Sequence, residues 1–176
     1  MTLAVIQRGL AEVIRTGATT SGDEYVRSVV GSDRVDLLRE IVLWWRTFGV
    51  QRACPLTSRL LLRQDRLDGV VAQFVADHSI SPYIEDLAQT FVDSLRQDDD
   101  SLVAAVASFE AAIIRVKRGN RDRHVIEWPT EPYGVLGALL GDGPLPPPTG
   151  ASAWTIVSAE LPRRFEVLAS APAGHG

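Results

Sequence analysis

The feature that most constrains this 176-residue chain is a change in the period of its apolar residues near Gly119. Up to about Arg118 the apolar residues recur every three or four positions, as in helices that bury one face. After Gly119 proline and aromatic residues become more frequent and the period shortens toward two, which is typical of strands. We therefore predict a mainly α-helical protein. An N-terminal bundle of about six helices over residues 1–120 is followed by a small α+β subdomain over 121–172 and a disordered tail over 173–176.

The predicted helix that follows Ser32 is the most apolar one, and Gly49 ends it. Its apolar side chains form one wide stripe, and the helix is therefore predicted to be central in the bundle. The stripe consists of Leu37, Leu38, Ile41, Trp44, Trp45 and Phe48. Further along, Ser81-Pro82 starts another helix, and the acidic run Asp98–Asp100 favours the N-terminus of a helix that ends at about Arg118.

Three segments of the C-terminal subdomain have the pattern of strands: 124–128, 153–159 and 164–169. The last two are predicted to form an antiparallel hairpin, and the first completes a three-stranded antiparallel sheet. A short helix over about 131–140 lies between the first two strands, with Pro132 in its first turn. A free sheet edge accepts an extended peptide by β-augmentation. The alternative is a sheet that merely covers the helical core.

Composition narrows the function. The net charge of the chain is −4. Cys54 is the only cysteine and the three histidines lie far apart in sequence, so we expect neither a disulfide nor a metal site, and no cofactor, in this chain. The longest apolar stretches are far shorter than the roughly 18 residues that a membrane span needs. The N-terminus lacks the pattern of a secretory signal, and we predict a cytoplasmic protein.

Few polar residues are candidates for catalysis. Glu110 lies at the margin of an apolar helix face, where it is either a functional acid or a structural carboxylate that pairs with an arginine or caps a helix. His78 is predicted to be a core or helix-end histidine, and Cys54 a small buried or loop residue. The sequence has no phosphate-binding glycine loop and no nucleophile elbow. A small hydrolase or isomerase that uses Glu110 and His78 is one alternative function.

A basic cluster stands out in this acidic chain, and it consists of Arg115, Lys117, Arg118, Arg121 and Arg123. Three interpretations remain open: cations that complement the C-terminal end of a helix dipole, a docking surface for an acidic protein or peptide, and a nucleic-acid contact. No aromatic residues for base stacking are interleaved with these cations. A DNA-binding transcriptional regulator is the main alternative function.

Several segments, taken in order, resemble a known family. They are residues 3–14, 60–95, 107–119, 124–140 and 154–167, with Phe74, Ser81-Pro82, Phe91, Glu110, Trp128-Pro129 and Leu161-Pro162 as the most distinctive positions. In these patterns the chain resembles the helical accessory proteins that accompany multinuclear non-haem iron oxygenases of the methanobactin-oxidase type in ribosomal peptide maturation. Such proteins are often described as DNA-binding.

The resemblance implies a non-catalytic subunit of a heterodimer, which binds the leader of a precursor peptide and presents it to the oxygenase. The iron belongs to the partner, and this chain needs no cofactor. The leader adds as a strand to the C-terminal sheet, with Trp154, Thr155, Ile156, Val157, Arg164, Phe165 and Val167 as expected contacts. Arg115, Arg118, Arg121 and Arg123 are then expected to meet acidic residues of the leader or of the enzyme.

Overall fold

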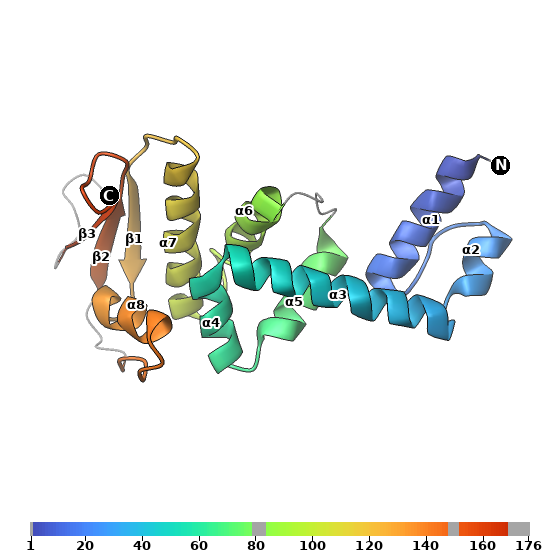
Figure 1. Cartoon of the computed structure of the whole chain (residues 1–176), viewed down its shortest axis with the longest axis horizontal. Helices are drawn as coiled ribbons and strands as arrows, with labels where there is room; N and C mark the ends of the chain where they lie inside the picture. The colour runs from blue at the N-terminus through green and yellow to red at the C-terminus, as the bar shows by residue number, and fades with distance from the viewer. Residues whose placement is uncertain (1, 79–83, 148–151, 169–176) are drawn as a thin grey trace. The chain divides into compact units, whose positions relative to one another are not determined.

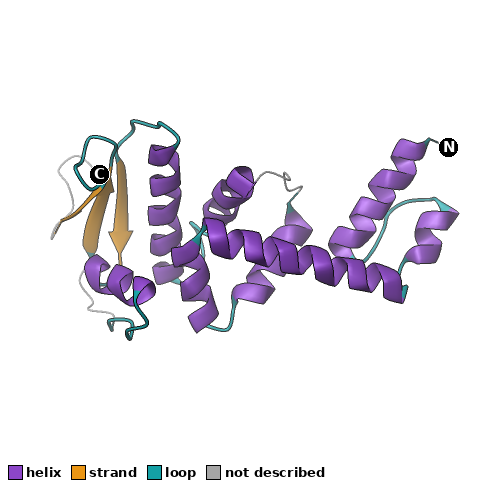
Figure 2. Ribbon diagram, viewed as in Figure 1, coloured by secondary structure: helices purple, strands orange, loops and turns teal. Residues whose placement is uncertain are grey.

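The computed structural model describes residues 2–78, 84–147 and 152–168 of the chain (Figure 1). Helices come first and the strands lie near the C-terminus, which confirms the predicted fold class (Figure 2). The elements of the described ranges are α1 (Leu3–Thr16), α2 (Glu24–Val29), α3 (Asp33–Ala53), α4 (Pro55–Arg63), α5 (Leu67–Asp77), α6 (Ile84–Ser94), α7 (Ser101–Lys117), β1 (His124–Trp128), α8 (Pro132–Leu140), β2 (Ala153–Val157) and β3 (Phe165–Leu168). The predicted helix start at Ser81-Pro82 and the predicted disordered tail lie outside the described residues.

Packing groups the chain into two compact units, and each unit draws on two separate stretches of sequence. The first consists of Met1–Gly49 and Leu67–Ile80, and the second of Val50–Arg66 and Ser81–Gly176. This grouping does not follow the division predicted at residue 120, because α4 and α6 pack against α7, and α7 packs against the sheet. No helix in the described part of the chain is long and apolar enough to cross a bilayer.

The first unit has a small apolar core in which Val13, Val26 and Val35 come together from α1, α2 and α3. The loop between α1 and α2 is held by Glu12, whose carboxylate accepts hydrogen bonds from the Thr20 amide and the Thr19 hydroxyl, both at 3.1 Å. The hydrogen bond from the Thr20 amide favours the charged form and lowers the pKa of Glu12. Glu12 thus orders the connection that brings α2 onto α1.

Helix α3 does not lie as its apolar pattern predicts. The stripe of Leu37, Leu38, Ile41, Trp44, Trp45 and Phe48 is exposed, and the two tryptophan side chains are each 59% exposed. The opposite face turns inward, where Val35 joins the core and the Arg39 guanidinium lies against Gly17 at the C-terminal end of α1. The predicted central position of this helix is therefore wrong, since α1 and α2 contribute their apolar residues to the Val35 side only.

The second unit contains the sheet, in which the strand order is β1-β2-β3 and both pairs are antiparallel. Helix α7 packs against β1 and β2. Trp128 of β1 is fully buried, its ring centroid lies 5.7 Å from that of Phe109 in α7, and its Nε1 donates to the Thr155 hydroxyl at 2.9 Å. The predicted acidic start of α7 is confirmed, because Asp100 accepts a hydrogen bond from the Leu102 amide.

Helix α8 is fixed at both ends. At its start the Glu131 carboxylate accepts hydrogen bonds from the Tyr133 and Gly134 amides. At its end Arg59 of α4 donates to the Leu139 carbonyl at 2.6 Å, and Arg63 donates to the Ala138 carbonyl at 2.7 Å. These cations satisfy carbonyl groups that have no partner within the helix and complement its dipole. They hold α8 beside α4, which places one face of α8 close to the start of β3.

Candidate functional site

The sheet has two outer edges, on β1 and on β3, and this decides which predicted contacts are able to pair with an added strand. Strand β2 lies between the other two and is paired along both sides. The backbone of Trp154–Val157 is therefore not free for strand addition, and the prediction that this segment receives the peptide is wrong for backbone pairing. Thr155 and Val157 are also fully buried. They support the sheet from within.

Within the described part of the chain, no strand pairs with the outer edge of β3. In an antiparallel ladder, residue pairs that exchange hydrogen bonds alternate with pairs that do not. The Ser158 amide donates to the Arg164 carbonyl at 2.9 Å, and in the same register Phe165 lies opposite Val157 and Val167 opposite Thr155. The N–H and C=O groups of Phe165 and Val167 therefore point away from β2. These two predicted contacts lie where an added strand would form its hydrogen bonds.

An apolar cavity of about 590 Å³ lies beside the start of β3. Phe165 forms part of its wall, with a ring centroid 5.2 Å from that of Phe109 and 6.0 Å from that of Tyr133. The apolar part of the lining comes from α7, α8 and the chain around α4, and includes Ile113, Ile114, Leu136, Leu140, Pro55 and Leu56. Leu140 and Tyr133 are 68% and 55% exposed. The cavity is open to the surface, and its volume is in the range of small-ligand and peptide side-chain pockets.

Three cations, Lys117, Arg163 and Arg164, also line this cavity, and all three are exposed. Among the described residues, no carboxylate lies within 4.0 Å of any of the three. Arg164 has a φ of 65°, in the left-handed region, and its amide donates to the Leu161 carbonyl at 2.9 Å within the turn between β2 and β3. This conformation costs a residue with a side chain about 1 kcal/mol relative to glycine.

Among the described residues that line this cavity, Glu110 is the one carboxylate, and its role is structural. It is 5% exposed, and its two oxygens accept hydrogen bonds from the Leu56 amide at 3.0 Å and the Thr57 amide at 2.9 Å. These amides belong to the first turn of α4, so Glu110 caps that helix from α7. Burial raises the pKa of Glu110, although both hydrogen bonds oppose the shift. The interpretation of Glu110 as a helix-capping carboxylate is confirmed.

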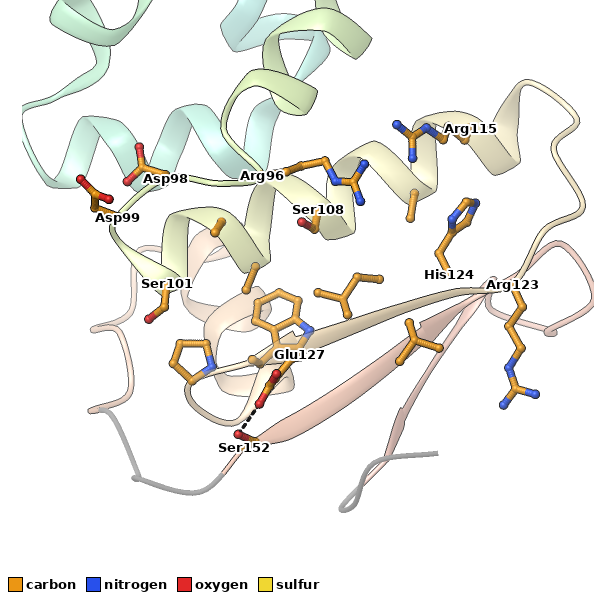
Figure 3. Close-up of a pocket in the computed structure, with 17 residues that line it drawn as sticks. Arg96, Asp98, Asp99, Ser101, Ser108, Arg115, Arg123, His124, Glu127 and Ser152 are labelled. Atoms are coloured by element: carbon orange, nitrogen blue, oxygen red, sulfur yellow. Dashed lines mark hydrogen bonds between the residues drawn. The ribbon is translucent and has the colours of Figure 1, made fainter. Parts of the chain in front are cut away.

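The opposite edge of the sheet borders a more polar groove of about 650 Å³. The whole of β1 lines it, and across from the strand lie small residues of α7, among them Ala104, Ser108 and Ala112. Figure 3 shows His124 beneath Arg96 and Arg115, while farther along the strand the Ser152 hydroxyl donates a hydrogen bond to the Glu127 carboxylate. Partial burial, helped by the Arg115 charge, lowers the pKa of His124. The His124 side chain therefore favours its neutral form here.

The basic cluster divides into paired and exposed members. Arg115 contacts Asp93 at 2.6 Å and Arg118 lies 3.9 Å from Asp86, and both carboxylates come from α6. Arg121 and Arg123 are exposed on the connection to β1. Arg115 therefore helps to hold α6 and α7 together, whereas the Arg118 contact is long and exposed on both sides. The role of all four arginines toward a partner stays a prediction.

The other polar candidates have structural surroundings. His78 follows α5 directly, with its ring centroid 4.7 Å from that of Phe74 and its Nδ1 3.1 Å from the Phe74 carbonyl oxygen, as expected for a helix-end histidine. Cys54 is fully buried, and burial raises the pKa of its thiol. Within the described ranges, no three His, Cys, Asp or Glu side chains are close enough together to hold a metal ion.

The sequence singled out four residues that line the cavity beside β3, namely Phe165, Arg164, Glu110 and Lys117, but did not place them together. Tyr133, Leu140 and Arg163, which also line the cavity, were not among the predicted site residues. One signal was present, because α8 carries more apolar residues than one buried face requires, including Leu139 and Leu140 in succession.

No protein-family model matches this chain, and neither a curated protein nor a solved structure shows significant similarity to it.

Proposed function

We propose that this chain is a non-catalytic recognition subunit that binds the leader of a ribosomally made precursor peptide as an extra strand along β3. The observation that carries the proposal is the arrangement at Phe165 and Val167. Their backbone groups point to the free edge, and the Phe165 side chain lines an apolar cavity. Strand addition gains affinity from main-chain hydrogen bonds and selectivity from pockets for alternate side chains.

The proposal includes a protein partner, an iron-dependent oxygenase that modifies the peptide and holds the iron itself. The exposed stripe on α3 supports a protein partner of some kind. Its six side chains present an apolar patch on the order of 600 Å², at the upper end of what monomeric proteins expose. The choice of an iron oxygenase rests on the family resemblance. In such a complex the subunit acts by raising the effective concentration of the core peptide at the partner's active site.

A DNA-binding regulator remains the alternative, with the basic cluster over 115–123 as its contact surface. The structure offers it less support, because Arg115 and Arg118 already pair with carboxylates of α6. Salt separates the two functions. Neutralising several phosphates makes affinity fall steeply with ionic strength, whereas strand addition through main-chain hydrogen bonds and an apolar cavity depends on it less.

Two proline variants test the proposed edge. Val167→Pro removes an amide that points outward from β3, and Val125→Pro removes the equivalent outward amide from β1, so neither variant breaks a bond within the sheet. The tagged chain and both variants are purified from the native host, and the proteins, peptides and iron that accompany them are measured. Far-UV circular dichroism establishes that each variant keeps the fold.

We expect the parent chain and Val125→Pro to carry a short peptide and an iron-containing enzyme, and Val167→Pro to retain the enzyme and lose the peptide. Loss of the peptide from Val125→Pro alone would move the site to the β1 groove. Recovery of the parent chain by itself, or with DNA, would refute the proposed function.

A further inference from the structure

We infer that the peptide bound along β3 is an acidic, apolar segment: two large apolar side chains two positions apart, with a carboxylate beside them. This inference rests on the proposed function and specifies the class of peptide. It follows from the two kinds of surface that meet at the cavity beside β3, an apolar wall and a rim of exposed cations.

The apolar requirement follows from strand geometry. Side chains at positions i and i+2 of an extended peptide lie on the same face, about 7 Å apart. A strand beside β3 would direct one such pair toward the face on which Phe165 packs against Phe109. The cavity of about 590 Å³ is larger than one aliphatic side chain needs, so it has room for two neighbours of this kind. Ile113 and Leu136 in the wall favour branched or aromatic residues.

The acidic requirement follows from charge. Lys117, Arg163 and Arg164 bring three positive charges to one cavity, and no carboxylate of the described residues lies within 4.0 Å of them. Glu110 contributes its charge from the wall, but both of its oxygens are used by the Leu56 and Thr57 amides. An Asp or Glu of the peptide would therefore gain charge-assisted contacts, and a Lys or Arg at the same place would be repelled.

The backbone at Arg164 is a second, independent observation. Its φ of 65° is one that glycine adopts without strain, yet the position carries a long cation. Within the turn Arg164 takes part through its backbone: its amide donates to the Leu161 carbonyl, and its carbonyl accepts from the Ser158 amide. Folding alone would thus favour glycine at this position, and binding through the guanidinium explains an arginine. Arg164→Gly therefore separates the two roles, because it relieves the backbone and removes the charge.

The experiment selects peptides from a random twelve-residue library displayed on phage, with the full chain as bait at physiological salt. We expect enriched sequences to carry two large apolar residues at i and i+2 and an Asp or Glu within two positions of them. Affinity for the best synthetic peptide is expected to fall about fivefold in Arg164→Gly and in Lys117→Gln. Arg27→Gln, which removes an exposed cation of α2 that does not line the cavity, is the matched control and should bind as the parent does. The melting temperature of Arg164→Gly should equal or exceed that of the parent.

The outcomes distinguish this inference from the proposed function. Enrichment of neutral or basic peptides whose binding is abolished by Val167→Pro would refute the acidic requirement and leave strand addition at β3 standing. An equal loss of affinity in Arg27→Gln would also refute it, since the effect would then reflect net charge. The absence of any enriched sequence would count against both.

Discussion

Replacement of Glu110 by alanine should destabilise the second unit more than replacement of an exposed glutamate by alanine does. The variant leaves the Leu56 and Thr57 amides without the acceptors that cap α4. Each unsatisfied buried donor costs about 1–3 kcal/mol, and we expect a total loss of about 3 kcal/mol in unfolding free energy. Glu131 is the matched control, because its carboxylate caps α8 in the same way from an exposed position. Glu131→Ala should cost about 1 kcal/mol.

The assay is denaturant unfolding followed by tryptophan fluorescence. Trp128 is fully buried in the second unit, whereas Trp44 and Trp45 are each 59% exposed, so the change in emission reports mainly on the sheet and α7. Equal losses in Glu110→Ala and Glu131→Ala would refute the capping role assigned to Glu110.

Glu110 should also shape the dependence of stability on pH. Its folded-state pKa is raised, chiefly by burial, above the ordinary value of 4.5, so the folded state binds the proton more tightly than the unfolded state does. Its contribution to stability is therefore greatest below pH 4.5 and declines as the pH rises through the raised pKa. Glu110→Gln cannot titrate and should lack this decline. A parent chain that gains stability relative to Glu110→Gln as the pH rises would contradict the direction of the shift.

Three further predictions concern other parts of the chain. The pKa of Glu12 is lowered in the folded state, so its contribution to folding stability is present above pH 4.5 and is lost as the pH falls through the lowered value. The melting temperature of Glu12→Gln should therefore fall less than that of the parent as the solution is made acidic, and an equal fall would argue against this role. The Cys54 thiol is fully buried and its pKa is raised, so a thiol reagent at pH 8 should label it only after denaturation; equal rates in folded and unfolded protein would show that it is accessible. Replacing Trp44 and Trp45 by serine should change unfolding free energy by less than about 1 kcal/mol and reduce binding of a hydrophobic dye, whereas a loss of several kcal/mol would place both rings in a core.

Local pattern was enough to predict most of the secondary structure. The alternation in His124–Trp128 and the Pro132 start of α8 are local signals, and both elements form where they were expected. The apolar stripe of α3 shows the limit of this reasoning. Periodicity indicates which face of a helix is apolar, but not whether other parts of the same chain pack against that face. In α3 the inward face is the one that carries Val35 and Arg39.

The candidate site was less predictable, because it depends on which strands are neighbours. Phe165 and Val167 were expected to contact the peptide, but so was β2, and only the strand order shows that β2 is central. The cavity beside β3 combines residues from α7, α8 and a turn that are far apart in sequence. The capping of α4 by Glu110 joins residues 53 and 54 positions apart. No local pattern carries such information.

That distant cap has a consequence for synthesis. Helix α4 is only 9 residues long, too short to be stable alone, and its amides leave the ribosome 53 and 54 residues before the carboxylate that caps them. At about 5–20 residues per second, the wait is roughly 3–10 s. Residues 67–80, which belong to the other unit, emerge during this interval. The first unit therefore has all of its sequence available before the second does, and α4 joins the structure later than its place in the chain would suggest.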